Sequence, residues 1–313
     1  MVTAFVFPGQ GSQAVGMGQE LAAAFPTARH ILEEVDEALK QSLSRLMANG
    51  PEDELTLTKN AQPALMAVSL AVVRVLQAEG GIDIAKACNC VAGHSLGEYS
   101  ALAAAGAFTV DVAARLLKTR GQAMQQAVPV GEGAMAALIG VDFDVAEAIT
   151  EEAAQGDVCT MANDNAPGQV VLSGAAAAID RVVEIAPEHG VRRVILLPVS
   201  APFHCAMMAP AADVMETALA DAALDRPLVP LIANVIAEAV EDPARIRRLL
   251  VEQVTGMVRW RESVLTMKGR GVDTLVELGA GKVLTGLTRR IDKEFSAISV
   301  SDPEGIETFL NSL

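Results

Sequence analysis

A serine between two glycines, in the stretch covering residues 91–100, constrains this chain more than any other feature. The apolar residues 90–92 are typical of the end of a buried strand, and the small or apolar residues 100–107 are typical of a tightly packed helix. In the pattern Gly-x-Ser-x-Gly, the small flanking residues permit a sharp strand-to-helix turn that exposes the hydroxyl. The free N–H groups of the following helix suit a developing oxyanion. The stretch predicts a nucleophile at Ser95; a buried loop serine is the alternative.

Strand and helix patterns alternate on both sides of this stretch. We predict strands over residues 4–7, 229–234 and 274–278, and helices over 26–46, 61–78, 110–128, 207–223, 244–254, 259–268 and 282–291. Such alternation predicts a hydrolase-like α/β fold, with a parallel sheet covered by helices on both faces. Hydrophobic residues form 51% of the 313, which is enough for a large core, and aromatic residues form only 3%, so aliphatic side chains must fill it.

The pattern changes between residues 131 and 198. Here strands 134–141, 158–162, 169–173 and 192–199 and helices 144–155 and 175–189 follow the order β-α-β-β-α-β of a ferredoxin-like unit. Residues 163–168 (Asn-Asp-Asn-Ala-Pro-Gly) predict a turn between the middle strands. We therefore expect residues 131–198 to form a small subdomain inserted into a large domain made of residues 1–130 and 199–313.

Charge and composition exclude several classes of protein. The net charge is −15 and the chain has no run rich in Lys or Arg, so a nucleic-acid partner is not expected. Residues 1–7 lack the basic start of a signal peptide, and the apolar residues 64–76 are too few to span a bilayer. We expect a cytoplasmic protein. Its cysteines are predicted to be reduced core residues, because no second pair accompanies Cys88 and Cys90 to complete a metal site.

A serine nucleophile needs a neighbouring base, most often histidine. Of the four histidines, His30 lies in a surface-type helix and His189 at a helix end, while the side chain of His94 diverges from Ser95 and is expected to order the turn. His204 remains, in a rigid loop at the point where the chain returns to the large domain. His204 is the predicted base, with a buried structural histidine as the alternative.

An acidic partner for this histidine is not evident. Asp164 and Asp180 lie between the serine and the histidine in sequence, but in the predicted small subdomain rather than at the end of a main-sheet strand. The sequence therefore favours a Ser–His dyad oriented by an amide or a backbone carbonyl.

Two further features fit a binding site. Arg120 lies on the predicted helix 110–128, which follows the helix after Ser95. If it is functional, it would bind a substrate carboxylate through two parallel hydrogen bonds; a solvated arginine is the alternative. Residues 8–13 (Pro-Gly-Gln-Gly-Ser-Gln) form a tight loop after the first strand, where backbone amides can face a ligand. An ordinary strand-to-helix turn is the alternative there, and the glycine spacing does not match a phosphate-binding loop.

Several motifs together resemble the malonyl-CoA:acyl carrier protein transacylase family, in matching order from about residue 3 to the end. The motifs are Phe7-Pro8-Gly9-Gln10-Gly11-Ser12-Gln13, Gly93-His94-Ser95-Leu96-Gly97-Glu98-Tyr99, Thr119-Arg120-Gly121, Ala162-Asn163, residues 168–174, residues 199–204, Gln253-Val254 and Val276-Glu277-Leu278-Gly279. Acyltransferase domains of polyketide and fatty acid synthases share much of this set.

The resemblance implies a role for each matching residue. Ser95 is acylated, His204 is the general base and then the acid, and Arg120 holds the malonyl carboxylate. The backbone amides of Gln10 and Leu96 form the oxyanion hole.

The remaining matches concern orientation and substrate contact. The main-chain carbonyl of Gln253 orients the imidazole, and Gln62 and Asn163, with His94, contact the substrate path. Phe203 is bulkier than the residue in many bacterial members, which bears on the tolerance of branched acyl groups.

The expected function is therefore malonyl transfer from malonyl-CoA to the phosphopantetheine thiol of acyl carrier protein, for fatty acid synthesis, by a monomer without metal or cofactor. The alternatives are an acyltransferase serving a polyketide synthase, a serine hydrolase or thioesterase, and a non-catalytic binding protein. Because carrier proteins are acidic, docking needs a local basic patch. The candidates are Arg192 and Arg193, or Arg259, Arg261, Lys268 and Arg270.

Overall fold

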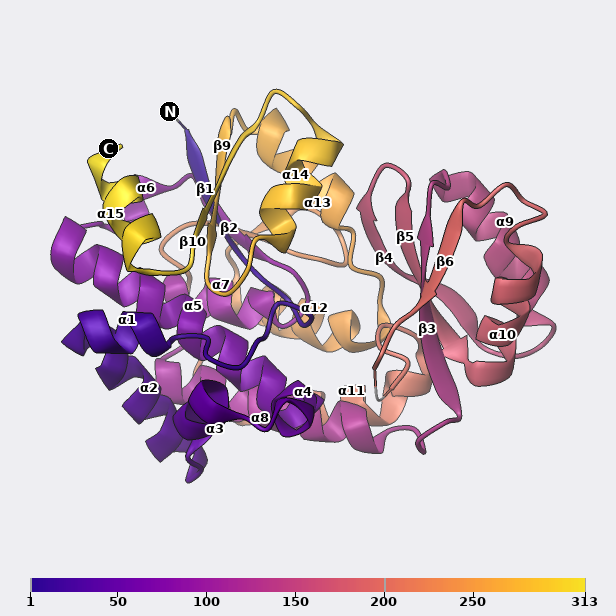
Figure 1. The fold of residues 1–313 in the computed structure, drawn as a ribbon, viewed down its shortest axis with the longest axis horizontal. Coiled ribbons are helices and arrows are strands. Elements are labelled where there is room, and N and C mark those ends of the chain that lie inside the picture. The colour runs from indigo at the N-terminus through magenta and orange to yellow at the C-terminus, as the bar shows by residue number, and fades with distance from the viewer. Residues whose placement is uncertain (1, 200, 313) are drawn as a thin grey trace.

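A six-stranded sheet forms the centre of the larger part of the molecule (Figure 1). The computed structural model describes residues 2–199 and 201–312. The strand order is β10-β9-β1-β2-β7-β8, and all neighbours are parallel except β7 and β8. The bounds are β1 Thr3–Phe7, β2 Cys90–Gly93, β7 Leu231–Ile232, β8 Ala239–Val240, β9 Thr274–Leu278 and β10 Ser296–Val300.

Helices cover both faces of this sheet because its central strands are apolar on both sides. Along β1, Ala4 and Val6 face the cluster under α13 and α14, while Phe5 and Phe7 face the larger core under α5 and α7. The helices of this part are α1 Gln19–Ala24, α2 Pro26–Leu39, α3 Leu43–Asn49, α4 Glu52–Thr56, α5 Thr58–Gly80, α6 Ile84–Ala87, α7 Gly97–Ala104, α8 Val110–Gln126, the short 3₁₀ helix η1 Ala206–Met208, α11 Ala209–Asp221, α12 Pro243–Thr255, α13 Trp260–Gly269, α14 Val283–Ile291 and α15 Pro303–Asn311. The predicted α/β class is confirmed.

A second, antiparallel sheet lies beside the first (Figure 1). Its strands are β3 Gly133–Ile139, β4 Cys159–Ala166, β5 Gln169–Ala175 and β6 Arg193–Leu196, in the spatial order β4-β5-β3-β6. The helices α9 Phe143–Ala154 and α10 Ala176–Ile185 share a core with the side chains of Ala136 and Leu138, whereas Met135 and Ala137 on the other face of β3 belong to the main core. The element order along the chain is β-α-β-β-α-β; the division into two domains at residues 131 and 198 remains a prediction.

The structure corrects several predicted elements. The predicted helix over residues 26–46 is two helices, because Lys40 adopts a left-handed conformation with φ 50° and the Asp36 carboxylate accepts from the Ser44 N–H at 2.8 Å. The predicted turn over residues 163–168 is wrong at its start, since β4 continues to Ala166. The strands β8 and β10 and the helices α1, α4, α6 and α15 were not predicted.

The apolar helix near residues 64–76 is longer than predicted. It forms α5, whose 23 residues are sufficient in length and composition to cross a membrane, with a window hydropathy of 1.4. That window is 83% buried inside the protein, and a core helix passes the same test of length and composition. Contacts with α2 and α8 place α5 in the main core.

Candidate active site

Ser95 lies at the point of a sharp turn between β2 and α7. Its φ of 53° is in the left-handed region. A Cβ at Gly93 would lie 1.9 Å from the Gly97 backbone, and one at Gly97 would lie 2.3 Å from the Phe7 carbonyl oxygen. Both glycines are therefore required by close backbone approach, as predicted from the pattern.

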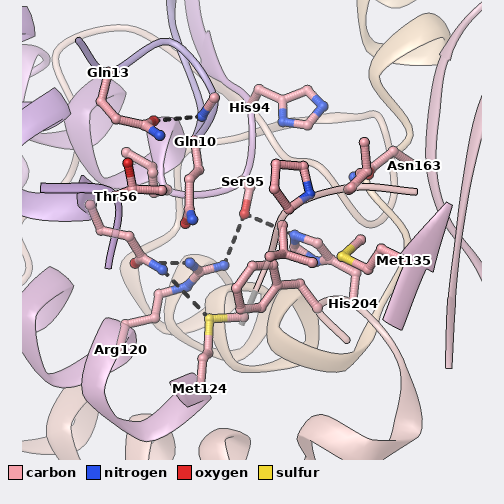
Figure 2. Close-up of a pocket in the computed structure, with 17 residues that line it drawn as sticks. Gln10, Gln13, Thr56, His94, Ser95, Arg120, Met124, Met135, Asn163 and His204 are labelled. Carbon is pink, nitrogen blue, oxygen red and sulfur yellow. Dashed lines mark hydrogen bonds between the residues drawn. The ribbon is translucent and has the colours of Figure 1, made fainter. Parts of the chain in front are cut away.

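His204 meets this serine directly (Figure 2). Its Nε2 lies 2.8 Å from Ser95 Oγ, and its Nδ1 lies 2.8 Å from the main-chain oxygen of Gln253 and 3.1 Å from that of Gly256. Because both carbonyls can only accept, Nδ1 carries the proton and Nε2 is left to accept from the serine hydroxyl. Burial, together with the positive charge of Arg120, lowers the pKa of His204 to about 3, so the imidazole is neutral at physiological pH.

The two acids that lie between the serine and the histidine in sequence do not contact His204. Asp164 is buried and pairs with Arg261 at 2.8 Å, and Asp180 lies on α10 in the second sheet. The imidazole is thus oriented by two backbone carbonyls.

Arg120 reaches the serine from α8. Its side chain is 1% exposed, and it donates to Ser95 Oγ at 3.0 Å, to Gln62 Oε1 at 3.0 Å and to Gln253 Oε1 at 2.8 Å (Figure 2 shows the first two). All three acceptors are neutral, and among the described residues no carboxylate pairs with it. The adjacent Gly121 permits this approach, because a Cβ there would lie 2.6 Å from the Lys59 Cα. A dry guanidinium without a paired carboxylate can receive one from a ligand.

A cavity of about 230 Å³ opens above the serine. The predicted contact residues Gln10, Gln62, His94 and Asn163 line it, together with Gly11, Gln13, Thr56, Ser95, Leu96, Arg120, Met124, Met135, Leu197, Pro198, Val199, Phe203 and His204. Thioether, aliphatic and phenyl groups make up much of the wall around Arg120 (Figure 2). The cavity therefore suits a short acyl group with one anionic end.

The two amides assigned to an oxyanion hole lie on the Pro-Gly loop and at the start of α7. Leu96 is the residue that caps α7, and the N–H groups on either side of it are engaged: Ser95 donates to Asn234 Oδ1 at 2.8 Å and Gly97 to the His94 carbonyl at 2.9 Å. In the loop, Gly11 N–H donates to Gln13 Oε1 at 2.7 Å, and both Gln10 and Gln13 line the cavity. This arrangement leaves the Leu96 amide at the positive end of the helix.

His94 points away from the serine, as predicted. Its Nε2 lies 2.8 Å from Asn165 Oδ1, and its ring tilts against Trp260 at a centroid distance of 5.8 Å. His94 thereby ties the nucleophile turn to β4 of the second sheet. Of the other histidines, His30 is exposed and His189 pairs with Glu152 at 2.8 Å.

A hydrogen-bonded group beneath the site was predicted only in part. It consists of Asn234, Glu98 and Gln253. Asn234 accepts from Ser95 N–H and donates from Nδ2 to the Gly93 carbonyl at 2.8 Å. Glu98 is 2% exposed and accepts from Asn234 N–H at 2.7 Å and from the side-chain amide of Gln253. No motif in the sequence marks Asn234, because its partners are distant in the chain.

The cysteines are not part of this site. Cys88, Cys90, Cys159 and Cys205 are all buried and free, as expected of reduced core residues. Among the described residues, no group of three or more His, Cys, Asp or Glu side chains is arranged to hold a metal ion.

A serine on a sharp strand-to-helix turn, hydrogen-bonded to a buried histidine, is typical of enzymes that move acyl groups. A sequence model of the acyl transferase domain family matches residues 4–301, so the protein is an acyltransferase. It is 44% identical over 99% of its length to the malonyl CoA-acyl carrier protein transacylase of Bacillus subtilis (96% of that protein), and 45% identical over 98% of both chains to that of Escherichia coli K12.

Solved structures agree with this assignment. An acyl-carrier-protein S-malonyltransferase from Bartonella henselae is 55% identical, with a TM-score of 0.97 over 100% of this chain and 99% of that one. A malonyl-transacylase solved in complex with a type II polyketide synthase acyl-carrier protein is 42% identical, with a TM-score of 0.97 over 100% of both chains. The chain belongs to the malonyl CoA-acyl carrier protein transacylase family.

Proposed function

We propose that this protein transfers a malonyl group from malonyl-CoA to the phosphopantetheine thiol of an acyl carrier protein. The observation that carries this proposal is Arg120, a buried guanidinium 3.0 Å from Ser95 Oγ whose described partners are all neutral. An acyl group that is attacked at one end by the serine and bound at the other by arginine must be short and must end in a carboxylate.

In the first half-reaction, His204 Nε2 takes the hydroxyl proton as Ser95 Oγ attacks the thioester carbonyl carbon. The negative charge on the carbonyl oxygen is stabilised by the backbone amides of Gln10 and Leu96. The intermediate collapses by breaking the C–S bond, and the departing CoA sulfur takes the proton from His204. The product is a malonyl ester on Ser95.

The second half-reaction reverses these steps with a different thiol. His204 takes the proton of the phosphopantetheine thiol, whose sulfur attacks the ester carbonyl, and the proton returns to Ser95 as the C–O bond breaks. Protons and electron pairs balance without a resident cofactor. The Gln253 carbonyl, 2.8 Å from His204 Nδ1, keeps the imidazole oriented throughout.

Gln62, Asn163 and His94 complete the proposed substrate contacts. Gln62 has a definite orientation because its Oε1 accepts from Arg120 and its Nε2 lies 3.6 Å from Met124 Sδ. It therefore holds the guanidinium on the side away from the serine. Asn163, on β4 of the second sheet, and His94, beside the serine, line the cavity.

The proposed setting is fatty acid synthesis by a cytoplasmic monomer; the names of the bacterial relatives support the malonyl transfer to an acyl carrier protein on which this setting is based. A role with a polyketide synthase is the second candidate, because the relative solved with a polyketide carrier protein is 42% identical over the whole chain. Rates of transfer to purified fatty acid and polyketide carrier proteins separate the two, since the proper carrier is expected to have the higher kcat/KM.

Replacement of Arg120 tests the proposed substrate. In Arg120→Ala, acylation by malonyl-CoA should fall by about a hundredfold or more, because a charge-assisted bidentate contact is lost, while acylation by acetyl-CoA falls much less. Arg115→Ala, an exposed change on the same helix, is the matched control. An equal fall for both acyl groups would show that Arg120 supports the fold and does not select the substrate.

The hydrolase alternative is tested by the fate of the acyl-enzyme. A transacylase passes the malonyl group to holo acyl carrier protein much faster than to water, and release of free malonate at the same rate with and without the carrier would favour a hydrolase.

A further inference from the structure

Arg120 and Glu98 lie on opposite sides of the Gln253 side chain. Both charged residues are buried, with exposed fractions of 1% and 2%, and Gln253 is 0% exposed. The amide accepts from the Arg120 guanidinium through Oε1 at 2.8 Å and donates to the Glu98 carboxylate through Nε2. A guanidinium can only donate and an ionised carboxylate can only accept, so the orientation of the amide is fixed by its two neighbours.

The carboxylate of Glu98 is surrounded by donors. Its Oε1 accepts from Asn234 N–H at 2.7 Å and its Oε2 from the Gln253 amide, so the ionised form satisfies both contacts. Burial raises the pKa of Glu98 to about 8, and the Asn234 N–H, the Gln253 amide and the charge of Arg120 act against that rise. Among the described residues, Glu98 forms no direct ion pair.

The neutral side chain of Gln253 is a spacer between the two charged residues, and this separation affects substrate binding. A buried guanidinium without a nearby negative charge is costly, but a carboxylate in direct contact would occupy the donors that the substrate needs. With one amide between them, the ionised Glu98 is a counter-charge for Arg120 in the empty site, and no carboxylate occupies the guanidinium donors.

We propose that Glu98 is a positioning residue: in its ionised form it is the counter-charge of Arg120, held one amide away by Gln253, so that the guanidinium is fixed and available when the acyl carboxylate arrives. The inference rests on the proposed function, in which Arg120 binds that carboxylate. The same carboxylate also fixes Asn234, and through it the Ser95 N–H, so both the arginine and the nucleophile turn depend on Glu98.

A double-mutant cycle tests the coupling of the two charges. Thermal unfolding is measured at about pH 9, above the pKa of Glu98, for Glu98→Gln, Arg120→Met and the double variant. We expect the fall in Tm of the double variant to be smaller than the sum of the falls in the two single variants. Each single variant leaves one buried charge without its counter-charge, whereas the double variant leaves none. Glu252→Gln, an exposed carboxylate beside Gln253, is the control and should add to Arg120→Met. Additive shifts for Glu98 would overturn the proposal.

A swap of the two side chains tests the spacer itself. In Glu98→Gln/Gln253→Glu every donor still meets an acceptor along the chain from Asn234 to Arg120, but the carboxylate now touches the guanidinium and competes with the substrate. We expect the double variant to fold and its ratio of malonyl to acetyl acylation to fall about tenfold or more. The ratio cancels losses that are common to both acyl groups, such as the lost contact of the Gln253 amide with the Ser95 carbonyl.

The outcomes separate this proposal from the function on which it rests. If Arg120→Ala keeps the wild-type ratio of malonyl to acetyl acylation, the substrate assignment is wrong. If that ratio falls in Arg120→Ala but the swap variant keeps it, only the role of Glu98 is wrong. If Glu98→Gln does not fold, the swap variant decides. Failure of the swap to fold would also count against the proposal, because the swap retains the hydrogen-bond polarity from Asn234 to Arg120.

Discussion

At the scale of single residues, the hydrogen-bond partners of His204 determine which of its two ring nitrogens carries the proton. His204 Nδ1 faces two carbonyl oxygens, 2.8 and 3.1 Å away, which leaves Nε2 to accept from the serine. A neutral carbonyl orients the imidazole without stabilising its charged form as an aspartate would. The low pKa of His204 follows from this environment, with burial as the main cause and Arg120 as the second.

This environment predicts an unusual pH dependence. Because the pKa of His204 is about 3 and not 6.5, the neutral base persists as the pH falls, and the single-turnover rate of acylation by malonyl-CoA should not drop between pH 6.5 and about 5. The free energy of unfolding, in contrast, should fall as the pH is lowered from 6.5 to about 3. In this range the histidine of the unfolded chain is protonated, whereas His204 in the folded chain remains neutral until about pH 3. A rate that halves near pH 6.5 in a chain that remains folded would contradict this account.

At the scale of secondary-structure elements, the active site depends on close contact between α5 and α8. Gln62 on α5 and Arg120 on α8 meet at 3.0 Å, and the contact is possible because Gly121 has no side chain. A Cβ at Gly121 would lie 2.6 Å from both the Thr58 carbonyl oxygen and the Lys59 Cα, so the two helices would have to separate.

Gly121→Ala should therefore destabilise the protein by about 1–3 kcal/mol, through overpacking, and reduce malonyl acylation more than acetyl acylation, because it displaces Arg120. Gly286→Ala is the matched control, since that glycine is in the middle of α14 with nothing within 4 Å of the added Cβ. The control should stabilise by about 0.5–1 kcal/mol. Denaturant unfolding and acylation assays measure both, and a Gly121→Ala variant as stable and selective as the wild type would refute the contact argument.

Local sequence patterns could predict many of these elements. The turn at Ser95, the small glycines and most helices of the large part follow from local patterns, because strand and helix periodicity is local. The start of the turn at residues 163–168 could not be predicted, since Asp164 N–H pairs with the Val258 carbonyl at 3.0 Å and β4 is extended by a distant segment. Glu98 and Asn234 were missed as partners for the same reason: they are 136 residues apart, and their contact exists only in the folded chain.

At the scale of the whole molecule, residues from both sheets meet at the active site. Several basic residues considered for carrier docking are already paired: Arg259 with Glu262, Arg261 with Asp164, and Lys268 with Asp292 and Glu294. Among the ion pairs of the described residues, none involves Arg192 or Arg193, which are exposed at the start of β6. These two arginines are the better candidates for contact with an acidic carrier protein.

Docking at this pair predicts a selective effect. Arg192→Glu/Arg193→Glu should raise the KM for acyl carrier protein about tenfold and weaken its salt dependence, while acylation by malonyl-CoA stays unchanged. Arg45→Glu, an exposed change on α3 at the other side of the molecule in Figure 1, is the control. An unchanged KM for the carrier in the double variant would place the docking surface elsewhere.

In the proposed mechanism, Ser95 carries the malonyl group between two thiols. The most direct measurement is the intact mass of the protein after brief exposure to malonyl-CoA, compared with Ser95→Ala, which removes the only atom that the account assigns as nucleophile. We predict a gain of one malonyl group on the wild type alone, and its loss when holo acyl carrier protein is added. A malonyl gain of equal size on Ser95→Ala would contradict the account.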